Sequence, residues 1–186
     1  MAVQPPADGW FDGATVGACV VRRIGNEWRM WYAGRSKVGF DGIMPIATGC
    51  VGLATSPDGL LWQRLAGEEL GGSVLSPGPA GSFDSTHVAV GDVLLQERPD
   101  GGVHYEMYTF GGGSHAPSLG AKQLPVGADM AIGKATSEDG VHWQRSLDPL
   151  IEPAAGQVFV GWPQVLPLDS MSPQDGGYAM YYHAMR

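Results

Sequence analysis

The residues best suited to chemistry lie in one segment, DSTHVAVGD at positions 84–92. Carboxylates acting with a histidine can transfer protons, and paired carboxylates cleave glycosidic bonds. Asp92 is the strongest single candidate, because an unpaired charge within an apolar strand is costly to bury. We therefore predict catalytic roles for Asp92, Asp84 and His87. The alternative for Asp92 is a structural carboxylate whose hydrogen bonds are satisfied.

The spacing of these acids limits how they can act together. Asp84 and Asp92 would lie up to ~26 Å apart on an extended chain, whereas two glycosidase carboxylates are separated by roughly 5–9.5 Å. A catalytic pair therefore needs a folded-back loop or a carboxylate from another part of the chain, such as Asp12. Because Asp92 and His87 are five positions apart, they face opposite sides of a regular strand. They can cooperate only if His87 lies in a loop or a bulge intervenes.

Three further side chains could hold a ligand. Arg35 follows the apolar segment MWYAG and could bind a hydroxyl or carboxylate, while Trp162 could stack on a sugar ring or simply pack. His115 lies in a long Gly-rich loop, 111–127, which we expect to act as a lid. No motif for a cofactor and no histidine pair at metal-ligand spacing is present. We expect no cofactor and no metal.

A long internal repeat indicates the elements that must position these residues. GLATSPDGLLWQR at 52–64 returns as GKATSEDGVHWQR at 133–145, identical at nine of 13 positions with an offset of 133 − 52 = 81. MWYAG at 30–34 has counterparts at 107–111 and 180–184. Such a period is typical of a repeat architecture. The recurrent Ser-x-Asp-Gly segments predict tight hairpin turns, because a residue that recurs in every unit belongs to the architecture.

Each repeat unit contains short β-branched and aromatic runs between turn residues. These predict strands at 16–21, 27–33, 51–55, 62–65, 88–96, 103–110, 129–136, 143–146, 158–166 and 177–184. The fold class is all-β, a β-propeller of four-stranded antiparallel blades; a sandwich would not explain the repeat. About two and a half blades are present: blade one at about 10–66, blade two at about 82–148 and an incomplete blade three at about 156–186. Since propellers have roughly four to eight blades, we expect a fragment of a five-bladed ring, completed by the same longer chain or by self-association.

Charge and cysteine content limit the partners. With 11 Lys and Arg against 19 Asp and Glu, the net charge of −8 argues against nucleic acid and anionic membranes. The sequence also lacks an apolar run of the roughly 20 residues that a membrane span needs. Cys19 and Cys50 are expected two strands apart, too far for a disulfide, and both buried. Two free thiols without a glycosylation sequon favour an intracellular or organellar protein.

The sequence resembles a known group of propellers. MWYAG at 30–34 followed by GLATSPDG at 52–59 is similar to the arabinanase, levansucrase and invertase superfamily of five-bladed glycoside hydrolases. FDSTHV at 83–88, GDV at 91–93 and GWPQV at 161–165 resemble an uncharacterised plant and algal branch, for which a plastid would be the organelle. The resemblance implies cleavage or transfer of glycosidic bonds by acids around the channel. Those acids usually lie at the starts of first strands, yet 16–18 and 160–163 carry none and only Asp92 lies nearby.

Two functions follow from the sequence. The first is a glycoside hydrolase-like propeller that acts on or binds a carbohydrate at its central channel, with two carboxylates at catalytic separation. The alternative is a catalytically inactive propeller that serves as a scaffold for a carbohydrate or protein partner, with an isolated carboxylate and an aromatic or basic rim.

Overall fold

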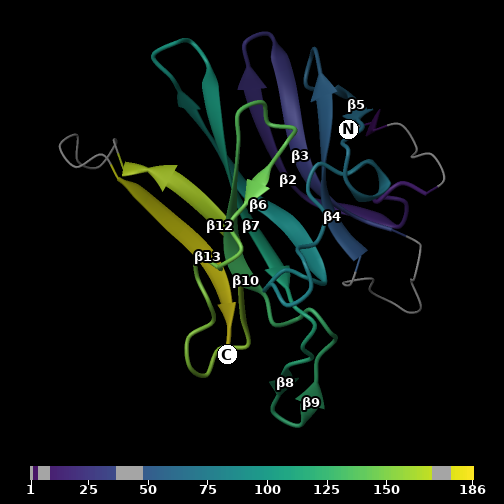
Figure 1. Ribbon diagram of the computed structural model, residues 1–186, viewed down its shortest axis with the longest axis vertical. Coiled ribbons are helices and arrows are strands. Elements are labelled where there is room, and N and C mark those ends of the chain that lie inside the picture. The colour runs from purple at the N-terminus through teal and green to yellow at the C-terminus, as the bar shows by residue number, and fades with distance from the viewer. Residues whose placement is uncertain (1, 4–8, 37–47, 169–176) are drawn as a thin grey trace.

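The computed structural model describes residues 2–3, 9–36, 48–168 and 177–186, and its strands form three main sheets that fan out side by side (Figure 1). Blade one has the order β1-β5-β4-β3-β2, formed by β1 (Ala2–Val3), β2 (Thr15–Ile24), β3 (Glu27–Arg35), β4 (Gly49–Ser56) and β5 (Leu61–Leu65). Blade two has the order β11-β10-β7-β6, formed by β6 (His87–Glu97), β7 (Val103–Gly112), β10 (Ala131–Ser137) and β11 (Gln144–Arg145). The third sheet pairs β12 (Phe159–Pro167) with β13 (Tyr178–Met185).

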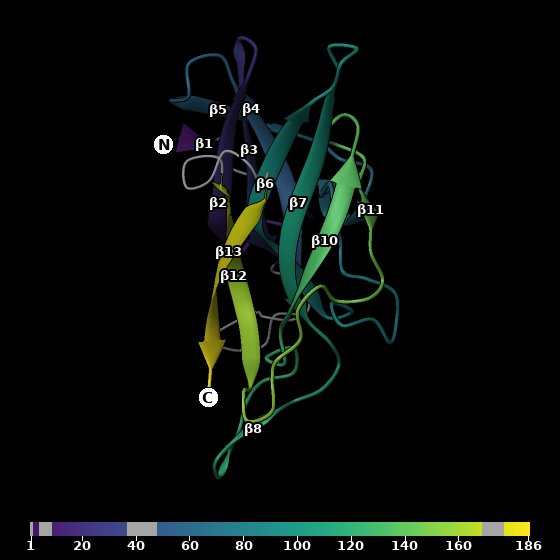
Figure 2. The ribbon, with the colours of Figure 1, turned by 90° about the vertical axis from the view of Figure 1, so that its left-hand side faces the viewer.

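The all-β fold built from four-stranded antiparallel sheets is confirmed, and the arrangement is that of a partial propeller. The first strands of the three sheets, β2, β6 and β12, contact one another in that order (Figure 2). Four short elements add to the predicted strands. β1 pairs in parallel with β5, and the hairpin of β8 (Ser118–Leu119) and β9 (Lys122–Gln123) lies within the loop between β7 and β10. A short 3-10 turn, η2 (Leu70–Gly72), follows β5.

The repeated Ser-x-Asp-Gly segments form the hairpin turns that the sequence predicts. In blade one, Ser56 Oγ accepts a hydrogen bond from the Gly59 amide at 2.9 Å, and Asp58 Oδ1 accepts one from the Leu60 amide at 2.8 Å. Gly59 has a φ of +74°, which a glycine adopts without strain. Blade two repeats these bonds with its own residues, Ser137, Asp139 and Gly140. Both segments therefore have a structural role, as hairpin turns.

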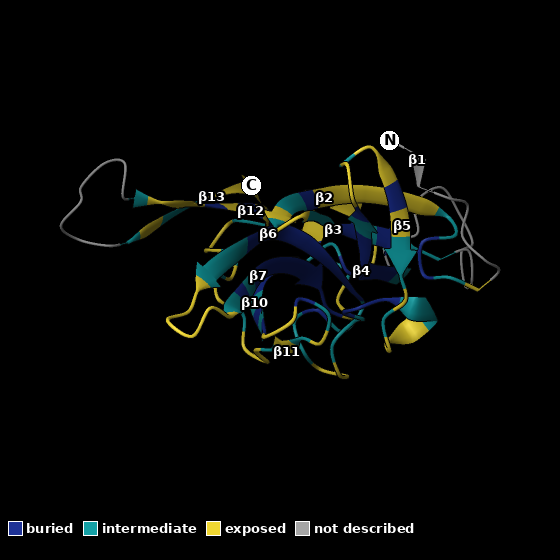
Figure 3. Cartoon of the chain, turned by 90° about the horizontal axis from the view of Figure 1, so that it is seen from above, coloured by how far each residue is buried: buried dark blue, intermediate teal, exposed yellow. Residues whose placement is uncertain are grey.

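Two core clusters lie where neighbouring blades meet, and a third lies on blade one. Between blades one and two, Trp31 is fully buried, and its Nε1 donates to the Gly140 carbonyl at 2.8 Å. Trp143, the Trp of the second repeat, packs edge-on against Trp31 with ring centroids 6.3 Å apart. A second cluster, including Phe110 and Val160, joins blade two to the third sheet. The inter-blade packing buries much of β6 and β7, whereas β2 and β13 are mostly exposed (Figure 3).

The two cysteines differ in environment. Both are free thiols, and Cys50 on β4 is buried, which raises its pKa to about 11. Cys19 on β2 is exposed, so the prediction that both cysteines are buried is wrong for Cys19. The reason is that the first half of β2 has no covering layer among the described residues. Within that same part of the chain, no helix has the length and apolarity to cross a membrane.

Candidate functional site

Most of the predicted site residues lie at one end of the three sheets. The strand pairing places Thr15 opposite Arg35, His87 opposite Gly112, and Phe159 opposite Met185. The starts of the first strands and the ends of the second strands therefore lie at the same end of the sheets. We call this the first-strand end, and it lies on the lower side of Figure 1. Asp84, Arg35, His87 and Trp162 belong to this end, and the loop from β7 to β10 that carries His115 extends from it.

Asp92 is buried deeper along β6 and connects all three sheets. Its side chain is 5% exposed, and its Oδ1 lies 2.5 Å from Arg22 Nη2 on β2. Oδ1 also accepts a hydrogen bond from the Val93 amide, and Oδ2 accepts one from the Val165 amide on β12, both at 2.8 Å. An irregularity in the pairing of β6, between Val90 and Asp92, lies directly before this carboxylate. Asp92 thus has the partners that a structural carboxylate requires.

Asp84 belongs to an ion pair that occurs in both complete blades. Its Oδ2 lies 2.5 Å from Arg145 Nη1, and its Oδ1 accepts a hydrogen bond from Ser82 Oγ at 2.8 Å. In blade one, Asp12 pairs with Arg64 at 2.7 Å in the same way. Asp84 and Asp92 therefore bind different arginines on different sheets. The structure does not join them into one carboxylate pair.

His87 is a buried anchor for the loop between β7 and β10. It is 2% exposed, and its Nε2 lies 2.8 Å from the Gly127 carbonyl, to which it donates as the protonated nitrogen. Burial lowers the pKa of His87, which favours the neutral ring. The Gly127 amide in turn donates to the His115 carbonyl at 3.1 Å. His87 and His115 are therefore connected through Gly127, and His87 fixes the loop that the sequence predicts to be a lid.

Trp162 has an unusual backbone. Its φ is +52°, a left-handed conformation that a bulky residue adopts only under strain. It lies where the pairing of β12 with β13 is irregular, between Gly161 and Gln164. Its ring packs against Phe110, with centroids 4.8 Å apart, yet the residue is 40% exposed. The ring is thus held rigidly while part of it faces solvent.

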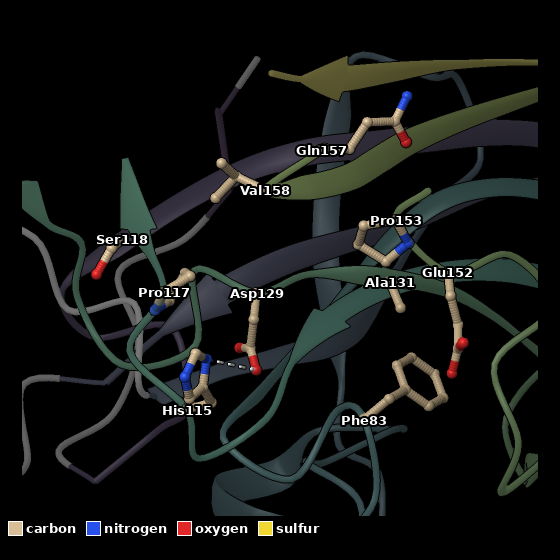
Figure 4. A pocket seen from close by; sticks show the side chains of 10 residues that line it. All are labelled: Phe83, His115, Pro117, Ser118, Asp129, Ala131, Glu152, Pro153, Gln157 and Val158. Atoms are coloured by element: carbon tan, nitrogen blue, oxygen red, sulfur yellow. Dashed lines mark ion pairs between the residues drawn. The ribbon is translucent and has the colours of Figure 1, made fainter. Parts of the chain in front are cut away.

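A hollow beside the lid loop contains acids that sequence reasoning missed. It measures about 400 Å³, and His115 and Asp129 lie at one side of it, Glu152 and Phe83 at the other (Figure 4). His115 Nδ1 is 3.9 Å from Asp129 Oδ2, a loose ion pair when the histidine is protonated. We call this the blade-two hollow. It is lined by Phe83, His115, Pro117, Ser118, Asp129, Ala131, Glu152, Pro153, Gln157 and Val158.

Blade one has a corresponding hollow, because the bridges Val51–Leu75 and Ile132–Ile151 occupy the same place in the two blades. This blade-one hollow measures about 230 Å³ and is lined by Gly9, Phe11, Ser36, Thr48, Cys50, Leu70, Gly71 and Pro77. The repeat offset of 81 aligns Thr48 with Asp129. Comparing the two copies at this position would have revealed Asp129 from the sequence.

Arg35, the last predicted ligand-binding residue, lies half-buried at the end of β3, and burial lowers its pKa. Within the described residues, no group of three His, Cys, Asp or Glu side chains could hold a metal ion.

Comparison with known proteins supports the fold. No family model and no curated protein matches the sequence. Solved structures do resemble it, with TM-scores of 0.54, 0.54 and 0.50 at 16%, 16% and 15% identity. They are a complex of BT0996 with RGII, a glycoside hydrolase, and the beta-1,2-mannobiose phosphorylase from Listeria innocua in complex with beta-1,2-mannobiose. They cover 97%, 98% and 90% of this chain, which spans 55%, 55% and 40% of theirs. The fold is thus glycoside hydrolase-like, and the chain spans about half the length of these structures.

Proposed function

We propose that this chain is part of a glycoside hydrolase-like propeller and recognises a carbohydrate at its first-strand end. The observation that supports this most directly is the exposed and strained Trp162 on the first strand of the third sheet. A partly exposed aromatic ring can stack on a sugar ring. The solved structures of the same fold include a glycoside hydrolase and a sugar phosphorylase. Membership of the arabinanase, levansucrase and invertase superfamily is part of this proposal.

The strain at Trp162 lies at an irregularity that recurs in the first strand of all three sheets, and Ala18, at the irregularity of β2, also has a positive φ of +33°. A non-glycine residue in the left-handed region costs about 1–3 kcal/mol. The ring contacts Phe110, Phe159 and His183, with centroids 4.8, 5.8 and 5.8 Å away, and each such aromatic contact returns about 0.5–1.5 kcal/mol. A glycine at position 162 would avoid the backbone cost. What favours a binding role is that Trp162 remains 40% exposed, so that part of its ring is open to a ligand.

Hydrolysis is the second candidate, and the glycoside hydrolase-like fold is what favours it. The roles proposed for it are catalysis by Asp92, Asp84 and His87, with Arg35, Trp162 and His115 holding the substrate. Turnover of a panel of nitrophenyl glycosides that is lost in Asp92→Asn, while the variant stays folded, would establish it. Turnover that is unchanged in a folded Asp92→Asn would remove Asp92 from the mechanism.

The binding proposal is tested by calorimetric titration with a panel of neutral oligosaccharides. Trp162→Gly should weaken binding at least about tenfold, yet change the free energy of unfolding by no more than about 1 kcal/mol, because strain relief offsets the lost contacts. Trp28→Ala is the matched control, since Trp28 lies on β3 next to the turn at the opposite end. Binding that survives Trp162→Gly, or the absence of any binding to the folded chain, would contradict the proposal.

A further inference from the structure

The blade-two hollow has the two kinds of surface that a sugar ring presents. Its apolar lining residues are Phe83, Pro117, Ala131, Pro153 and Val158, and its polar ones are His115, Ser118, Asp129, Glu152 and Gln157. A pyranose has apolar C–H faces and a rim of hydroxyl groups, so such a wall and such polar groups complement it. At about 400 Å³ the hollow also falls within the roughly 300–1,000 Å³ of ligand pockets.

The corresponding blade-one hollow shows that these features are not needed for folding. Phe11 and Pro77 take the places of Phe83 and Pro153, so the frame of the two hollows is the same. Thr48 takes the place of the carboxylate Asp129, and the space of about 230 Å³ is below the range of ligand pockets. Among the residues that the structure describes, the two acids and the larger volume are therefore confined to blade two.

The walls of the blade-two hollow are fixed before any ligand binds. The Gly113 amide donates to Asp129 Oδ1 at 3.2 Å, and His87 holds the lid loop through Gly127. A Cβ on Gly133 would overlap the Phe83 ring, so the strand below supports that ring closely. A site with pre-arranged groups loses less entropy when it binds.

The charge of the hollow selects among saccharides. Asp129 and Glu152 both line it, while no Lys or Arg is among its lining residues in the described part of the protein. His115 is the one lining residue there that can become cationic, and its side chain is 73% exposed and 3.9 Å from Asp129. The two carboxylates therefore attract a cation and repel an anion. An ammonium group is a strong donor to carboxylates.

We propose that the blade-two hollow is a subsite for a saccharide that carries a positively charged amino group. The ring packs against Phe83, and ammonium groups of the saccharide donate to Asp129 at one side of the hollow and to Glu152 at the other. This inference rests on the proposed carbohydrate function, and it specifies the class of sugar. It also places the subsite apart from Trp162, which is not among the residues that line the hollow.

The test is calorimetric titration of the 186-residue protein with three tetrasaccharides: a glucosamine tetramer, its fully N-acetylated form and a galacturonic acid tetramer. The variants Asp129→Thr and Glu152→Ser remove the two carboxylates, and Asp129→Thr introduces the blade-one residue. Each should weaken binding of the glucosamine tetramer at least about tenfold and leave binding of the N-acetylated tetramer unchanged. The control, Glu138→Gln, removes an exposed charge from the opposite end and should change neither. Thermal unfolding of each variant confirms that it is folded.

The other outcomes separate the two proposals. Unchanged binding of the glucosamine tetramer in both carboxylate variants would overturn the subsite. If Trp162→Gly still weakened the N-acetylated tetramer, the carbohydrate function would stand without the subsite. The galacturonic acid tetramer could instead bind more tightly than the glucosamine tetramer and lose that binding in Asp129→Thr. This result would overturn the proposed charge selection. If none of the three tetramers bound the folded protein, both proposals would fail.

Discussion

Blade one and blade two share a frame, and two of their differences lie in the hollows at the first-strand end and on the first strand itself. Both contain the buried Asp–Arg pair, the Ser-x-Asp-Gly turn and a Phe at the base of a hollow. Only in blade two does the hollow hold Asp129 and Glu152, and only there does the first strand carry a buried acid, Asp92. What the two blades share is what the fold requires. What blade two adds is where a particular function can be sought.

We expect the largest effect on the free energy of unfolding from replacing Asp92, whose counterpart in blade one is Cys19. Asp92→Ala should lower the free energy of unfolding by about 3 kcal/mol, because it leaves Arg22 and two buried amides without their partner. Cys19→Ala, at the aligned position, should change it by less than about 0.5 kcal/mol, since Cys19 is exposed. Urea unfolding measures both. Equal stability of the two variants would show that Asp92 is not the structural link between the blades.

The two Asp–Arg pairs differ in whether both carboxylate oxygens have a hydrogen-bond partner. In blade two, Ser82 donates to Asp84, whereas in blade one the corresponding Asp12 Oδ1 is buried and has no hydrogen-bond partner among the described residues. Ser82→Ala would give blade two the same defect, and we expect a loss of about 1–2 kcal/mol in urea unfolding. Ser118→Ala, at an exposed position of the lid hairpin, is the control. A loss no greater than that of the control would mean that this hydrogen bond contributes nothing.

The anchor at His87 should make stability depend on pH. Burial lowers the pKa of His87 in the folded state, so the unfolded state takes up a proton more readily. This contribution to stability is present above the unfolded pKa of about 6.5 and is lost as the pH falls towards the folded value. Unfolding between about pH 7.5 and 5 should show a slope of up to about 1.4 kcal/mol per pH unit from this group. His87→Gln should reduce the slope; an unchanged slope would contradict the role of burial.

We expect the smallest effect on the free energy of unfolding from exchanging Asp129 and Thr48, the residues at corresponding positions of the two hollows. Asp129→Thr should leave the free energy of unfolding within about 0.5 kcal/mol of wild type, because Asp129 is partly exposed and belongs to the additions of blade two. The reciprocal Thr48→Asp should lower it by about 1–2 kcal/mol, since the smaller hollow offers a charge less solvent. Thermal unfolding compares them. A clear loss in Asp129→Thr would show that this acid is structural.

Much of the fold could be read from the sequence because the repeat and the turn residues are local signals. Strands and Ser-x-Asp-Gly turns have periodicities and residue types that act over a few positions. The partners of Asp92 could not be predicted, because Arg22 and Val165 come from other blades and depend on how the sheets pack. The exposure of Cys19 likewise depends on which layer covers β2. Asp129 and Glu152 become a site only when the lid loop and the 152–158 segment meet.

The central claim is that a ligand binds at the first-strand end through residues that blade one lacks, namely Asp129 and Glu152 of blade two and Trp162 of the third sheet. Amide chemical-shift mapping with the glucosamine tetramer and its N-acetylated form tests it directly. We predict shifts at Trp162 with both tetramers, and shifts in the lid loop around His115 and Asp129 and near Glu152 with the glucosamine tetramer, while the blade-one residues Thr48 and Cys50 stay unchanged. Shifts of equal size in both hollows, or shifts confined to the Ser-x-Asp-Gly turns, would contradict the account.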